Sequence, residues 1–254
     1  MRLWNPGVMR PDNSLDPSAL QGTGGDDGVK FLGFDATGRY LIAVHESSTL
    51  RMWDFPQRRQ ILQPFKLSSF LYPYERISEV NISDDSKTIL VLVSPIYRDY
   101  PWRVVVLTRD NYGIDKVAEY VFPKDEPMNA VVANGDQIVV ARSIDGSLAV
   151  VTYDYYGSES YDGSISGMRV GSSRKAVLSK GGAVLGASVA GSEMWIVLQR
   201  FSGEQSKVVL DEGFAVNHAA LSSDGSTLVL SGEPDTRVYR WVHTYFGFPI
   251  WWHD

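Results

Sequence analysis

The sequence predicts an all-β fold built from a repeated unit. Short runs of β-branched and aromatic residues are bounded by Asp, Ser, Thr and Gly, which is typical of packed strands rather than helices. No stretch shows sustained helical periodicity, so we expect little helix. A turn rich in Ser, Asp and Gly recurs at the interval of one four-stranded blade. These observations predict a β-propeller of four-stranded antiparallel blades, about five to six in number, as a complete ring or as an incomplete, open one.

Composition supports a folded protein without a nucleic-acid or membrane partner. Hydrophobic residues make up 44% of the chain, which argues against disorder. The formal net charge of -6 gives no general attraction to nucleic acid or to anionic membranes. The chain has no cysteine, so disulfides and thiolate metal sites are excluded. It has neither a secretory signal pattern nor an apolar run of about 18 residues, and we expect a cytoplasmic protein.

The clearest copy of the unit spans Val29–Phe55. It contains three predicted strands, Val29–Phe34, Tyr40–Val44 and Leu50–Trp53, which are separated by polar turns. The first turn, Asp35–Gly38, ends in a glycine where a tight turn requires positive φ, a conformation that glycine adopts at little cost. This copy serves as the reference for the rest of the chain.

The turn of the reference copy recurs along the sequence. Ile82–Ser86 and Leu221–Gly225 match it well, and each is followed by an apolar strand. Val132–Gly135 and Val170–Arg174 are weaker copies. The anchor positions 38, 86, 135, 174 and 225 are 48, 49, 39 and 51 residues apart, a spacing typical of propeller blades. The predicted blade units are 29–63, 77–122, 128–160, 165–210 and 214–242.

Both ends of the chain carry further signals within a predicted single propeller domain, 1–254. Met1–Asn5 has the same pattern as Leu50–Asp54, so we expect residues 1–10 to give a strand of a partial blade or of a blade that closes the ring. The chain would then be either complete or a piece of a longer protein. Residues 243–254 form an aromatic tail, which we expect to pack on the propeller or on a partner.

The unit resembles a WD-repeat blade. Trp53-Asp54 matches the dipeptide of that family, and Trp4-Asn5 is a near match. No Gly-His pair precedes a first strand, and Ser47 or Ser48 stands at the place of the turn aspartate in the best copy. The chain is therefore similar to a WD-repeat propeller with degenerate repeats, in which apolar contacts hold the blades together. The resemblance implies a scaffold or sensor that binds other proteins.

No catalytic motif is present, so we expect no enzyme, no catalytic residue, no metal and no cofactor. The four histidines show no metal-ligand spacing, and neither a GxSxG nucleophile motif nor a phosphate-binding loop occurs. The alternative is a small hydrolase similar to propeller lactonases, with a metal in the central channel. Its candidate ligands by position are Glu79, Asn81, Asn129, Glu193 and Asn217.

The loops of the second blade are the candidate binding site. The connection 63–76 enters the blade, and the connection 94–103 joins its two middle strands. Both emerge on the same face of a propeller. Both are longer than a hairpin requires and rich in Tyr, Trp and Arg, the residues that dominate interface hot spots. We expect another protein or peptide to bind here. This chain would act alone or as part of a larger multidomain chain or complex. In the alternative, the aromatic residues cap their own blade. The candidate partner-binding residues are Phe70, Tyr72, Tyr74, Arg76, Tyr97, Arg98, Tyr100 and Trp102.

Overall fold

A computed structural model describes most of the chain between residues 28 and 253, together with residues 4–5 and 10–11. The gaps between 28 and 253 fall at 36, 58, 84, 111–112, 124–125, 134–136, 145–146, 154–158, 170–175, 180–183, 189–193, 202–203, 212–215, 223, 233–235 and 244–248. Two of the five turn anchors, Gly135 and Arg174, lie outside the described residues.

Apart from a two-stranded sheet near the start of the chain, the described strands form five antiparallel sheets, which follow one another along the chain and are called blades one to five. Blade one contains β3 (Val29–Phe34), β4 (Tyr40–His45), β5 (Thr49–Asp54) and an outer strand split into β6 (Arg59–Gln60) and β7 (Phe65–Lys66). Blade two contains β8 (Glu75–Ile82), β9 (Thr88–Pro95), β10 (Trp102–Arg109) and β11 (Ile114–Phe122). Blade three contains β12 (Glu126–Ala133), β13 (Gln137–Ile144), β14 (Ser147–Tyr153) and β15 (Glu159–Arg169). Blade four contains β16 (Ala176–Leu178), β17 (Val184–Ser188), β18 (Met194–Phe201) and β19 (Glu204–Asp211). Blade five contains β20 (Val216–Leu221), β21 (Thr227–Gly232), β22 (Thr236–His243) and β23 (Pro249–His253).

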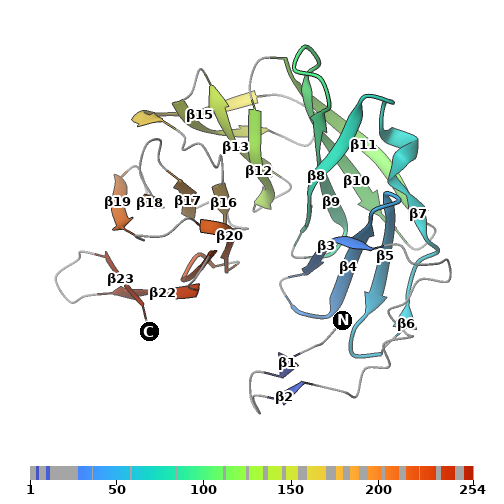
Figure 1. Ribbon diagram of the computed structural model, residues 1–254, viewed down its shortest axis with the longest axis horizontal. Coiled ribbons are helices and arrows are strands. Elements are labelled where there is room, and N and C mark those ends of the chain that lie inside the picture. Colours follow the sequence, from blue (N-terminus) through green and yellow to red (C-terminus); the bar gives the residue numbers. More distant parts are fainter. Residues whose placement is uncertain are drawn as a thin grey trace.

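The five blades are arranged in an arc around a common centre (Figure 1). The first strand of each blade lies innermost, and the inner strands of successive blades contact one another, from β3 to β8, β12, β16 and β20. Blades one and five lie at the two ends of this arc (Figure 1). The prediction of an all-β propeller with four-stranded antiparallel blades is confirmed.

The middle strands of blade two are buried on both faces because this blade packs between blades one and three. In β9, the side chains of Val91 and Val93 belong to the core shared with blade one. Leu90 and Leu92, which alternate with them, belong to the core shared with blade three. Strands that are buried on both faces require a continuous apolar run rather than an alternating one. The sequence of β9 therefore reports its central place in the stack of blades.

The predicted anchor turns adopt the expected backbone conformation. Gly38 has φ 68° and Gly225 has φ 73°, and Ser86 adopts φ 61° although it carries a side chain. In each turn, this residue donates its backbone N–H to the carbonyl oxygen three residues earlier, at Asp35, Ser83 or Ser222. The recurring turn motif thus marks the hairpin between the first and second strands of a blade.

The turn of blade one also contacts the turn of blade two. Asp35 is buried and accepts the backbone N–H of Tyr40 through Oδ1 at 2.8 Å. Its Oδ2 accepts the hydroxyl groups of Thr37 and Ser86, the second at 3.0 Å across the blade boundary. Burial alone would raise the pKa of Asp35, but these hydrogen bonds more than offset it and lower the pKa. The turn motif therefore contributes to the packing of blades as well as to hairpin closure.

Strands at the ends of the chain differ from the expected arrangement. Trp4–Asn5 is β1, and it pairs with β2 (Arg10–Pro11) rather than with blade five. Within the expected tail 243–254, Pro249–His253 forms β23 and pairs with β22 as the outer strand of blade five. Blade three extends to Arg169, beyond the expected limit at 160. Among the described residues there is no helix with the length and hydropathy needed to cross a membrane.

Candidate functional site

The two long loops of blade two are held together at one end of its sheet. The first loop contains η1, a 3-10 helix over Leu67–Phe70, and continues to Tyr74. The second loop connects β9 with β10. Ile96 donates its backbone N–H to the carbonyl oxygen of Tyr74 at 2.7 Å, which joins the loops directly. Each loop is also closed internally, by a bond from Glu75 N–H to Tyr72 and by one from Tyr100 N–H to Tyr97.

Four tyrosines from these loops form one aromatic cluster, which we call the tyrosine platform: Tyr72, Tyr74, Tyr97 and Tyr100. The rings of Tyr72 and Tyr74 are stacked with centroids 5.6 Å apart, and those of Tyr74 and Tyr100 are stacked at 3.8 Å. Tyr97 contacts Tyr100 in a tilted arrangement at 6.3 Å. The first loop supplies two of the rings and the second loop the other two, so the platform exists only because the loops meet.

The platform faces solvent. Tyr72 is 50% exposed and Tyr97 is 62% exposed, the highest fraction among the large apolar and aromatic side chains described. Ile96 directly precedes Tyr97 in the sequence and is 55% exposed. Contiguous exposed aromatic side chains on a rigid support are typical of surfaces that bind another molecule.

A buried arginine supports the platform from below. Arg103, at the start of β10, is 3% exposed, and its guanidinium pairs with both carboxylate oxygens of the fully buried Glu75, from Nε at 2.7 Å. It also donates to the carbonyl oxygen of Phe70 at 2.9 Å and to the carboxylate of Glu119 at 2.7 Å. The centroid of the Tyr72 ring lies 4.5 Å from its Cζ atom, within cation–π distance. Arg103 thus connects the first loop to two strands of blade two.

The surroundings of Glu119 and Tyr74 favour a charged carboxylate at the first and a protonated phenol at the second. Burial would raise the pKa of Glu119, but hydrogen bonds from Lys116 and Arg103 more than offset it and lower the pKa. Burial raises the pKa of the Tyr74 phenol, and the negative charge of Glu75 raises it further. The Tyr74 hydroxyl therefore stays protonated and remains a hydrogen-bond donor at neutral pH.

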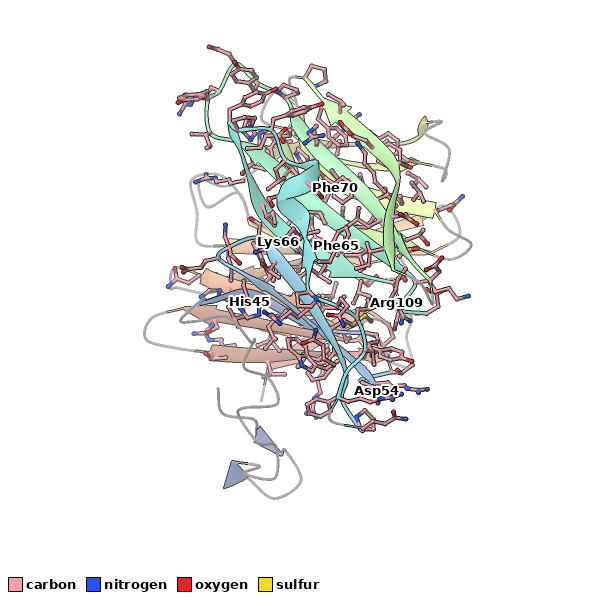
Figure 2. All side chains as sticks on the ribbon, turned by 90° about the vertical axis from the view of Figure 1, so that its right-hand side faces the viewer. His45, Asp54, Phe65, Lys66, Phe70 and Arg109 are labelled. Atoms are coloured by element: carbon pink, nitrogen blue, oxygen red, sulfur yellow. The ribbon has the colours of Figure 1, made fainter. Side chains whose placement is uncertain are left out.

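The eight predicted residues separate into an exposed group and an inward group. Arg98 directly follows Tyr97, Arg76 lies two residues after Tyr74, and both are exposed. Arg76 donates from Nε to the Ser94 hydroxyl at 3.1 Å. Phe70 instead packs on Phe65, with ring centroids 5.7 Å apart, at the core between blades one and two (Figure 2). Trp102 packs on the core between blades two and three. These two aromatic residues cap the blade rather than line its outer surface.

Sequence reasoning did not identify Glu75 and Arg103, which hold the site in place. The available signal was a charged residue at the first position of β8 and at the second position of the mostly apolar β10, each directly after a long aromatic loop. A charge at such a position is ordinary on a surface strand, so only the fold shows that the two residues form a buried pair.

The channel residues proposed for a hydrolase also converge in part. Glu79 on β8 accepts amide N–H groups from Asn129 on β12 at 2.7 Å and from Asn81 at 3.1 Å, both at Oε1. Asn129 in turn accepts the backbone N–H of Leu178 in blade four at 3.3 Å. Burial raises the pKa of Glu79 to about 7, although the two amide hydrogen bonds oppose the shift. Asn217 is exposed on β20, and Glu193 lies outside the described residues.

This channel group has the pattern of a proton-linked hydrogen-bond network. One carboxylate oxygen receives two amide donors, whereas a hard cation prefers a ring of oxygen atoms. Within the described part of the chain, no three His, Cys, Asp or Glu side chains gather as a metal site requires. The group links blades two, three and four through side chains near the centre of the arc.

Comparison with known proteins places the fold but no family. No family model and no curated protein sequence matches this chain. A functionally unknown protein from Desulfotomaculum acetoxidans has a similar structure, with a TM-score of 0.59, 11% identity, and coverage of 91% of this chain and 70% of that one. The WD40 domain of SCAP from fission yeast gives a TM-score of 0.52 at 10% identity over 85% of this chain and 53% of that one. A candidate 6-phosphogluconolactonase from Bacteroides uniformis gives 0.52 at 14% identity over 87% and 68%. The chain therefore shares the β-propeller fold with WD40 domains and with a protein described as a candidate lactonase.

Proposed function

We propose that this propeller is a non-enzymatic protein-interaction module that binds a protein or peptide partner on the tyrosine platform. The observation that carries the proposal is the exposed tyrosine cluster, which two loops build and a buried ion pair supports. A rigid aromatic surface loses little conformational entropy on binding, so most of its contact area contributes to affinity. Structural similarity to WD40 domains supports a protein partner in general.

We also propose a repeat type, a role and a cellular location for this module. The module is a WD-repeat-like propeller with degenerate repeats, which acts as a scaffold or sensor in the cytoplasm, alone or within a larger multidomain chain or complex. The Trp53-Asp54 dipeptide and the recurring turn support the repeat assignment. Apolar cores between the blades support it as well, because they supply the contacts that the missing Gly-His and turn-aspartate positions would otherwise provide.

Site-directed photocrosslinking in the source cells tests the platform. Tyr97 is replaced by photoreactive p-benzoylphenylalanine, and Val121, which is 51% exposed on the outer strand of blade two, is the matched control position. We expect discrete protein adducts from position 97 that do not form from position 121. Identical adducts from both positions, or no adduct from position 97, would contradict the proposal.

A captured partner then allows the energetic test. Arg98→Ala and Tyr97→Ala should each weaken its binding by about 2 kcal/mol, roughly thirtyfold, as expected of hot-spot residues. Thermal unfolding of both variants should match the parent protein, since both side chains are exposed. Unchanged affinity in both variants would remove the platform as the docking site.

The second candidate, a lactonase-like hydrolase with a metal in the channel, is favoured by the convergence of Glu79, Asn81 and Asn129. Calorimetric titration with Ca²⁺ distinguishes the two candidates. The interaction module should give no saturable heat that depends on Glu79. Saturable binding that Glu79→Gln abolishes would favour the hydrolase instead.

A further inference from the structure

We propose that the occupant of the tyrosine platform is a short, extended, acidic segment of the partner protein. This inference rests on the proposed function and specifies the chemistry of the partner. The exposed arginines Arg76 and Arg98 lie close to the platform tyrosines in the sequence. Hydrogen-bond donors, local charge and shape all favour an acidic, extended occupant.

The surface of the platform is rich in hydrogen-bond donors. Within the described residues, the phenol groups of Tyr72, Tyr74, Tyr97 and Tyr100 make no hydrogen bond to another side chain, and Arg98 forms no ion pair. A phenol O–H and a guanidinium fork both donate to carboxylates, and the guanidinium can do so through two parallel bonds. A partner that carries carboxylates matches this set of donors.

The local charge favours the same partner. The two carboxylates of Glu75 and Glu119 are paired with the two cations of Arg103 and Lys116, so this network carries no net charge. The exposed charged groups of connections 63–76 and 94–103 then include Arg76 and Arg98 against a single carboxylate, that of Asp99. The platform is positive on a chain whose net charge is -6. Screening over about 10 Å at 0.1 M salt makes the local charges count more than the distant ones.

The shape of the platform favours an extended segment rather than a helix or a folded domain. Tyr72, Tyr74 and Tyr100 stack in one column, and Tyr97 lies at its end, which gives a narrow strip. An extended chain rises about 3.3 Å per residue, so a few residues span such a strip. We expect their carboxylates to pair with Arg98 on the second loop or with Arg76 at the start of β8.

A displayed library of random short peptides is the test, selected separately on the full chain and on three variants. Tyr97→Ala removes part of the platform, and Arg98→Glu reverses one of its charges. Arg59→Glu makes the same charge change on β6 of blade one, where the side chain is also exposed. Circular dichroism and thermal unfolding verify that each variant is folded.

We expect the parent protein and Arg59→Glu to enrich peptides with two or more Asp or Glu residues, and Tyr97→Ala to lose the enrichment. Arg98→Glu should bind the selected acidic peptides at least about tenfold more weakly than the parent protein does. This change in affinity corresponds to roughly 1.4 kcal/mol. Its own selection should shift toward Lys and Arg.

The other outcomes separate the two proposals. Enriched peptides that depend on Tyr97 but carry no excess of acidic residues would overturn the acidic partner and retain the docking function. A selection with no dependence on Tyr97 would overturn both. Binding of a fluorescent oligothymidylate that Tyr97→Ala abolishes would replace the acidic segment with a single-stranded nucleic acid, because bases also stack on tyrosine rings.

Discussion

Glu79 illustrates how one side chain can make stability depend on pH. Burial raises its pKa from an ordinary value of 4.5 to about 7 in the folded protein. Between these values the folded state binds a proton that the unfolded state has released. Protonation of Glu79 therefore stabilises the fold fully below pH 4.5, and this contribution is lost as the pH rises through about 7.

The first prediction compares the parent protein with Glu79→Gln. The glutamine carbonyl oxygen can accept the same amide groups from Asn81 and Asn129, but the side chain carries no charge. We expect similar free energies of unfolding near pH 4.5 and an advantage of the variant that approaches roughly 3 kcal/mol above pH 7. Urea unfolding across this pH range measures the free energy of unfolding of both proteins. Subtracting one from the other cancels the contribution of the other carboxylates, which titrate alike in both. Two parallel stability curves would contradict the shifted pKa.

Arg103 and Glu75 form a buried ion pair whose members depend on each other. Removal of one partner leaves the other charge buried without compensation, which costs about 3–5 kcal/mol. The second prediction is that Arg103→Met destabilises the protein by this amount in urea unfolding. Arg76→Ala, one residue after Glu75 but exposed, is the control and should change the free energy of unfolding by less than about 0.5 kcal/mol. Equal effects from both substitutions would show that Arg103 is not the central support.

In the hairpin turns, the effect of backbone conformation on stability can be measured separately from the effect of side-chain packing. Gly38 has φ 68°, and a Cβ atom there would meet no atom within 4 Å. The third prediction is that Gly38→Ala lowers the free energy of unfolding by about 1 kcal/mol through backbone strain alone. Gly33 on β3 has equally open surroundings and no positive φ, so Gly33→Ala should be neutral or slightly stabilising. Equal losses in both variants would argue against strain as the cause.

The turns and middle strands were predictable from sequence because their causes are local. The last residue of each four-residue turn has a positive φ, which favours glycine there. Burial on both faces gives β9 its continuous apolar run. The outer strands were harder to predict. β15 and β23 receive hydrogen bonds on one side from the preceding strand, and this pairing imposes little pattern on their sequences. The aromatic loops were recognisable by composition, whereas their inward and outward residues depend on contacts with blades one and three.

On the scale of the molecule, each blade is connected mainly to its neighbours along the arc, as in other repeat architectures. Asn129 in blade three connects both of its neighbours, since it contacts Glu79 in blade two and Leu178 in blade four. The fourth prediction is that Asn129→Ala costs about 2 kcal/mol, because it leaves the buried Leu178 N–H without its acceptor. Hydrogen exchange should show the Leu178 amide exchanging faster than in the parent protein. Unchanged exchange at that amide would remove Asn129 from this role.

The stacked tyrosines also provide an optical signal. Rings as close as those of Tyr74 and Tyr100, 3.8 Å apart at their centroids, couple their electronic transitions. Such coupling gives exciton bands in the circular dichroism spectrum and strong ring-current shifts in proton resonances. The two rings come from different loops, so these signals report the joining of the loops without any attached probe. An occupant that inserts between the rings or displaces one of them would change the signal in proportion to occupancy.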